Sequence, residues 1–119
     1  MYKIECDPKK NRIYIKLSGF MRLDEMTKCS DETIAATAKL KRGYDVITDI
    51  VDFSPAAPEV TKEIERVQAH FVASGVRKGV RIVGSKVVAG LQFKRTGSSA
   101  GYASANVATL ADAEAELSK

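Results

Sequence analysis

Apolar residues occupy every second position in residues 2–7 and again in residues 12–18. This period-two alternation is typical of strands that bury one face. The segment 8–11, Pro-Lys-Lys-Asn, separates the two runs and has the composition of a turn. The pattern therefore predicts two antiparallel strands joined as a hairpin and ended by Gly19.

From residue 23 to residue 41 the apolar spacing changes to three and four residues, which predicts an amphipathic helix. Asp24 and Glu25 fall in its first turn and the basic residues of segment 39–42 in its last, as the helix dipole favours. Gly43 is expected to end this helix. The positions expected to face the core are Met26, Cys29, Thr33, Ala36 and Leu40.

Two β-branched runs, 46–51 and 80–83, indicate strands covered on both faces, which lie centrally in a sheet. The segment between them predicts a helix that begins at Pro58, where a missing N–H costs nothing, and ends at Gly75. The remaining chain predicts a third helix from Ser85 to about residue 99, a short strand within 102–107, and a last helix, 110–117, with a capping box of Thr109 and Asp112.

The predicted order is ββαβαβαβα over a single domain, residues 1–119. Strands that alternate with helices after a hairpin favour the α/β class, with a mixed sheet of about five strands that is mostly parallel in its later part.

Composition places the chain among folded domains, because 45% of its 119 residues are hydrophobic and 29% are charged.

No apolar run approaches the roughly 20 residues that a membrane span requires, and no signal sequence is visible, so we expect a cytoplasmic protein. Two isolated cysteines suit a reducing compartment. With His70 as its single histidine, the chain is expected to hold no metal and no cofactor.

The net charge is +4, and no acidic residue occurs between Glu65 and Asp112. We expect this half to attract anions or acidic partners, although a dispersed, solvated basic surface explains the same pattern and is favoured. Nucleic-acid binding is not expected, because aromatic residues make up 7% and the basic residues are not clustered. Those basic residues are Arg66, Arg77, Lys78, Arg81, Lys86, Lys94 and Arg95.

The element order resembles that of the STAS domain, which anti-sigma-factor antagonists share with the cytoplasmic tails of sulphate transporters. The resemblance is carried by residues 2–19, 44–53 and 75–84 and by Ala100-Gly101-Tyr102 before the last helix. It implies a regulatory module whose partner contacts come from the loop after the central strand and from the second helix. The expected contact residues are Asp52, Ser54, Pro55, Pro58 and Glu59.

Regulatory members of that family carry a phosphorylated serine at the start of the second helix. Counted from Asp49, this position falls on Pro58, within Ala56-Ala57-Pro58-Glu59, and proline cannot accept phosphate. The usual switch is therefore expected to be absent. Ser54 is the candidate substitute, although a loop hydroxyl before Pro55 explains it more simply.

Other candidate chemistry is sparse. Asp49 and Asp52 could form an acid–base pair, but we favour an ion pair between Asp49 and Arg81 and a turn at Asp52. His70 is interpreted as a residue of the helix surface. Ser85 and Lys86 open a helix and could form a weak anion site, without the spacing of a nucleotide-binding loop.

Three functions follow in order of preference. The first is a non-catalytic protein-interaction or regulatory module, whose partner is another protein or a second copy in a homodimer. The alternative is a carrier or sensor of a small apolar or anionic ligand, held between the Ala/Gly-rich segment 87–101 and the sheet. An enzyme ranks last, because no nucleophile, base and orienting group can be identified together.

Overall fold

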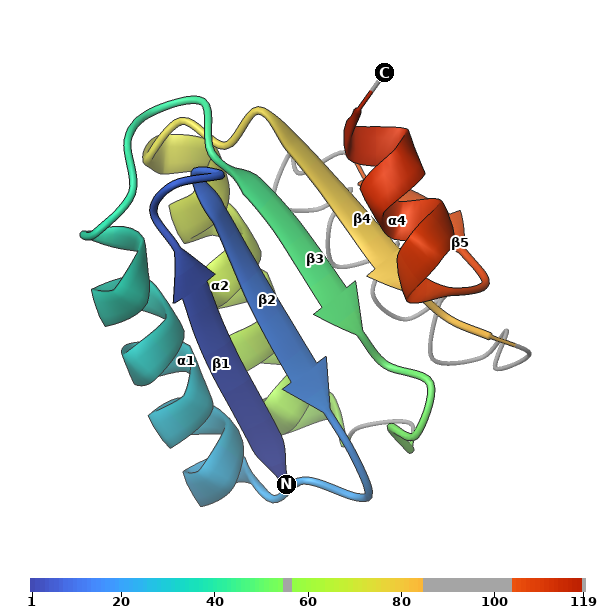
Figure 1. Ribbon diagram of the computed structural model, residues 1–119. Coiled ribbons are helices and arrows are strands. Elements are labelled where there is room, and N and C mark those ends of the chain that lie inside the picture. Colours follow the sequence, from blue (N-terminus) through green and yellow to red (C-terminus); the bar gives the residue numbers. More distant parts are fainter. Residues whose placement is uncertain (55–56, 85–103, 119) are drawn as a thin grey trace.

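The computed structural model describes residues 1–54, 57–84 and 104–118, which form one sheet of five strands with three helices (Figure 1). The sheet order follows the chain, with an antiparallel β1–β2 pair and parallel pairing from β2 to β5. The strands are β1 (Tyr2–Asp7), β2 (Arg12–Leu17), β3 (Asp45–Asp49), β4 (Lys78–Ile82) and β5 (Ser104–Val107). The predicted α/β class with a mixed sheet is confirmed.

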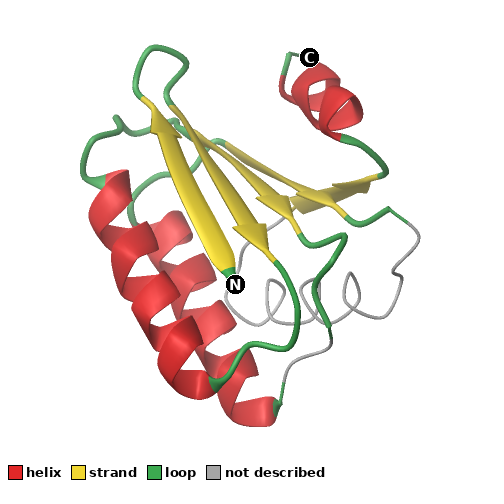
Figure 2. Cartoon of the chain, turned by 60° about the horizontal axis from the view of Figure 1, so that its bottom comes forward, coloured by secondary structure: helices red, strands yellow, loops and turns green. Residues whose placement is uncertain are grey.

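Helices cover the two faces of the sheet unequally (Figure 2). Helices α1 (Leu23–Thr37) and α2 (Pro58–Ala73) lie side by side on one face, and α4 (Leu110–Leu117) lies on the other. Helix α4 packs on β3, β4 and β5. Among the described residues, no helix lies over β1 and β2 on that face. The predicted third helix lies outside the described residues.

The central strands are buried as their β-branched sequences predict. In β3, Val46 contributes to the core beneath α1 and α2, and Ile47 to the smaller core beneath α4. Both side chains are at most 2% exposed. Complete burial of such a side chain stabilises the fold by about 2 kcal/mol. The sheet is therefore held from both sides at β3.

Helix α1 is shorter than predicted. It ends at Thr37, and the next residues form turns in which Lys39 N–H donates to the Ala36 carbonyl and Leu40 N–H to the Thr37 carbonyl. Tighter turns of this kind often end a helix. The prediction that the basic residues of segment 39–42 occupy its last turn is wrong, because the chain already turns back there toward β3.

Helix α2 begins at Pro58 as predicted, and Gly75 after its end has a positive φ of 86°. In α4 the Thr109 hydroxyl accepts a hydrogen bond from Asp112 N–H, as the predicted cap requires. None of the helices in the described part of the chain is long and apolar enough to cross a membrane.

Ion pairs hold α4 on the amino ends of the parallel strands. Glu114 receives hydrogen bonds from Arg12 and, at 2.9 Å, from the Tyr14 hydroxyl. Lys78 Nζ lies 2.9 Å from Glu116 Oε1. Because α4 has only eight residues and buries two of them, these bonds supply much of its attachment.

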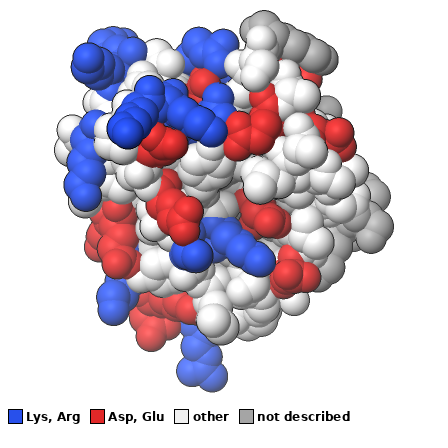
Figure 3. All heavy atoms as spheres, in the orientation of Figure 1, with Lys and Arg blue, Asp and Glu red and all other residues white. Residues whose placement is uncertain are grey.

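Lys86, Lys94 and Arg95 of the basic stretch that the sequence suggests lie outside the described residues, which include its other four members. Each of its described basic residues is engaged, because the fold brings acidic or hydroxyl groups from other segments to them. Exposed basic side chains gather instead over the β1–β2 turn and the loop after α1 (Figure 3). They include Lys9, Lys10, Lys41 and Arg42.

Candidate functional site

Two loops at the carboxyl ends of β2 and β3 are joined through their backbones. Gly19 N–H donates to the Asp52 carbonyl at 2.8 Å, and Ser54 N–H donates to the Gly19 carbonyl at 3.0 Å. Gly19 has φ 70°, a conformation that glycine adopts without strain. These bonds fix the start of the β2–α1 loop against the β3–α2 loop.

The β2–α1 loop is also anchored by the burial of Met21, the residue that follows Phe20. Met21 and Phe53 are completely buried, whereas the Phe20 side chain is 62% exposed. Leu23, the first residue of α1, is 44% exposed. A fixed backbone therefore presents two large apolar side chains to solvent.

We call Phe20, Leu23 and the neighbouring exposed Asp52 the carboxyl-end surface. Single exposed apolar side chains are ordinary, but neighbouring ones on an anchored loop are typical of interaction sites. The other large exposed apolar side chains of the described residues are Met1, Val72 and Leu110. Val72 and Leu110 belong to helices on opposite faces of the sheet.

The contact residues expected from the sequence lie next to this surface. Ser54 is half-buried, and Pro58 and Glu59 are exposed at the start of α2, at the same end of the sheet (Figure 1). Pro55 falls outside the described residues, as do Ser85 and Lys86 of the expected anion site.

Sequence reasoning missed Phe20 and Leu23. Phe20 follows the end of the alternating pattern at Gly19, and Leu23 begins the helical pattern but is not one of its expected core-facing positions. The available signal was an aromatic residue directly after a turn glycine, but the 62% exposure of Phe20 is a property of the folded chain.

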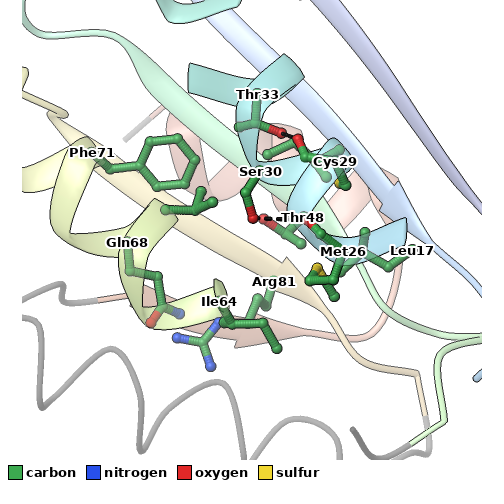
Figure 4. Close-up of a pocket in the computed structure, with 12 residues that line it drawn as sticks. Leu17, Met26, Cys29, Ser30, Thr33, Thr48, Ile64, Gln68, Phe71 and Arg81 are labelled. Atoms are coloured by element: carbon green, nitrogen blue, oxygen red, sulfur yellow. Dashed lines mark hydrogen bonds between the residues drawn. The ribbon is translucent and has the colours of Figure 1, made fainter. Parts of the chain in front are cut away.

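A small cavity lies between the sheet and helices α1 and α2 (Figure 4). Its volume is about 40 Å³, enough for about two water molecules and far below that of ordinary small-molecule sites. Arg81, Gln68 and Thr48 contribute polar groups to a lining that is otherwise mostly apolar. Among the described residues, this cavity gives little room for the carried ligand of the alternative hypothesis.

The expected ion pair between Asp49 and Arg81 is wrong. In the β3–β4 register Arg81 lies beside Thr48, whereas Asp49 lies beside Ile82. Because neighbouring strand residues point to opposite faces, Asp49 faces the α4 side and Arg81 the α1–α2 side. Asp49 instead accepts a hydrogen bond from Val51 N–H at 3.0 Å, and Arg81 donates to the Ser104 hydroxyl.

The remaining candidate nucleophiles and bases have structural roles. Burial raises the pKa of the Cys29 thiol to about 11 and also raises the pKa of Cys6. A reactive cysteine needs a lowered pKa instead. His70 Nε2 lies 2.8 Å from the Thr37 hydroxyl and joins α2 to α1. In the described ranges no group of three or more His, Cys, Asp or Glu residues is arranged to hold a metal ion.

Comparisons with known proteins do not extend this description. No protein-family model matches the chain, and neither a curated protein nor a solved structure matches it. The carboxyl-end surface is therefore interpreted from its own geometry.

Proposed function

We propose that this chain is a non-catalytic protein-interaction or regulatory module that binds a partner protein through the carboxyl-end surface. The observation that carries the proposal is the exposure of Phe20, on a loop whose backbone is hydrogen-bonded to the β3–α2 loop, and of Leu23 at the start of α1. The resemblance to STAS domains supports the same end of the sheet, because that family's partner contacts involve the loop after the central strand.

The anchoring of the loop favours binding energetically. A flexible loop loses conformational entropy when a partner orders it, which weakens binding. The hydrogen bonds between Gly19 and the loop at Asp52 and Ser54 already restrict this freedom in the free protein. Aromatic side chains are enriched in protein interfaces, so Phe20 is the expected centre of contact.

The charges around Phe20 and Leu23 indicate the chemistry of the partner. Asp24, Asp52 and Glu59 are exposed acidic residues at this end of the sheet, and Arg22 is an exposed basic one. An interface usually combines an apolar centre with a polar rim of complementary charge. We infer a partner surface with an apolar pocket and a mainly basic rim.

The proposal predicts that Phe20→Ser with Leu23→Ser weakens partner binding at least about tenfold, the effect of removing a central apolar contact. The immobilised chain would first be used to isolate a partner from cells of its source, and affinity for that purified partner would then be measured. Asp52→Lys tests the rim and should weaken binding by a smaller factor, mainly through slower association.

Matched controls are available on the helices. Val72→Ser and Leu110→Ser also remove exposed apolar side chains, 42% and 52% exposed, but Val72 lies near the end of α2 and Leu110 lies on the α4 face of the sheet. They should leave binding unchanged. Equal binding by the Phe20/Leu23 variant and by these controls, or failure to retain any partner, would contradict the proposed function.

A further inference from the structure

Strand β1 is the edge of the sheet, and one set of its backbone groups points away from β2. Met1 and Ser18 exchange two hydrogen bonds, at 2.8 and 2.9 Å. In an antiparallel pair the hydrogen-bonded residues alternate along the strand. The backbone N–H and C=O groups of Tyr2, Ile4 and Cys6 are therefore directed outward along the open edge.

A groove runs along this edge between β1 and α1. It has a volume of about 510 Å³. Figures 1 and 2 both place α1 along the outer side of β1, so the helix flanks the open edge. The lining residues, which define the β1 groove, are Tyr2, Ile4, Glu32, Ala35, Ala36 and Lys39.

The β1 groove has an apolar middle and opposite charges toward its two ends. The Tyr2 hydroxyl donates a hydrogen bond to Glu32, which places the acidic end near the start of β1. Cys6 Sγ lies 3.5 Å from the Ala36 carbonyl, and Lys39 follows in the next turn. The alanines leave room for another side chain between these charges.

We propose that the β1 groove binds an extended peptide segment of a partner protein, which pairs with β1 as an added antiparallel strand. Strand addition of this kind obtains its affinity from backbone hydrogen bonds and its specificity from alternate side chains. The residue opposite Ile4 is apolar and lies over the alanines. The residue opposite Cys6 is acidic and faces Lys39, and the residue opposite Tyr2 is basic and faces Glu32.

The position of helix α1 favours a single peptide strand, and not a second copy of this chain, as the occupant of the β1 groove. Symmetric antiparallel pairing of two β1 strands places both α1 helices on the same face of the joined sheet. Each α1 flanks the outer side of its own β1, so each would extend into the space of the other copy. A peptide brings no helix and fits between β1 and α1. This binding mode is separate from the carboxyl-end surface.

The test uses the synthetic peptide Thr-Glu-Thr-Val-Thr-Lys-Thr with blocked ends and the full chain labelled for amide NMR. At millimolar peptide, the amide signals of Ile4 and Cys6 are expected to shift most. A peptide with an N-methyl group on the valine nitrogen lacks the central donor and should leave those signals unshifted. Absence of shifts with the unmodified peptide, or equal shifts with both peptides, would overturn the proposal.

Two variants test the groove itself. Ala35→Trp fills it and should weaken binding at least about tenfold, whereas Ala69→Trp, at an exposed alanine of α2, should not. Lys39→Gln should weaken binding by about two- to fivefold, the range for an exposed ion pair. Equal affinity of the Ala35 and Ala69 variants would overturn the proposal. So would concentration-dependent dimerisation through β1 in sedimentation experiments without peptide, because the edge would then belong to a second copy.

Discussion

The two ends of the parallel strands differ in what they present. At the amino end, charged residues of β2, β3 and β4 pair with one another and with α4. Asp45 is the centre of this end, with Arg77 Nη2 at 2.7 Å and Arg12 Nη2 at 3.9 Å. At the carboxyl end, backbone hydrogen bonds join two loops and leave Phe20 and Leu23 exposed.

This difference indicates that the amino end mainly stabilises the fold, whereas the carboxyl end presents side chains for recognition. The amino end holds buried charges that need their partners, because an unpaired buried charge is strongly destabilising. The carboxyl end is fixed mainly through backbone atoms and completely buried apolar residues, so its exposed side chains contribute little to folding. Substitutions at the amino end should therefore change the free energy of unfolding, whereas substitutions at the carboxyl end should change partner binding.

The largest effect is expected from Asp45→Asn. Its carboxylate is 7% exposed and faces two guanidinium groups, so removing its charge should cost about 3 kcal/mol in the free energy of unfolding. Denaturant unfolding would measure the change. Asp52→Asn at the exposed carboxyl end is the control and should stay within about 0.5 kcal/mol. Equal losses in the free energy of unfolding for the Asp45 and Asp52 variants would contradict the proposed difference between the two ends of the sheet.

An intermediate effect is expected from Glu114→Gln. This change weakens the bonds from Arg12 and Tyr14 and should cost about 1.5 kcal/mol, the usual range for hydrogen bonds to a charged group. Hydrogen exchange should show faster opening of α4 and unchanged protection in α1. If α1 lost protection to the same extent, α4 would not be held by this local network.

The smallest effect is expected at the ion pair between Glu63 and Arg66 within α2, in which the Arg66 side chain is 40% exposed. Hydrogen bonds from Arg66 lower the pKa of Glu63 below 4.5 in the folded chain. Their stabilisation is therefore present above the ordinary pKa and is lost as pH falls through the folded value. Glu63→Gln should cost about 0.5 kcal/mol at neutral pH and nothing in strong acid. Unfolding measured at both pH values checks this, and a cost independent of pH would contradict it.

The amino-acid sequence predicts most of the elements but not how their side chains meet. The hairpin, the buried strands and the helix that begins at Pro58 follow from patterns within a few residues. The predicted ion pair between Asp49 and Arg81 was wrong, because the sequence does not specify the strand register, and a shift of one residue reverses the face of every side chain.

For the candidate site, the sequence predicted the loop that takes part but not the exposed apolar residues of the site. The loop that contains Asp52 and Ser54 does lie at the carboxyl end of the sheet, as the sequence suggests. Phe20 was not identified, because it lies between the alternating pattern and the helical pattern, and neither pattern specifies its exposure. The β1 groove likewise requires α1 to lie along the outer side of β1, which no periodicity along the chain specifies.

The sequence by itself determined the order of the described elements, the burial of β3 and the capping of α4, because periodicity and turn chemistry act between near neighbours. Only the tertiary structure decided the ion pairs of Arg12 and Asp45, the exposure of Phe20 and the open edge of β1. Arg12 and Glu114, for example, are 102 residues apart in the chain. Such contacts are set by how helices pack on the sheet and by strand register, and both depend on the whole chain at once.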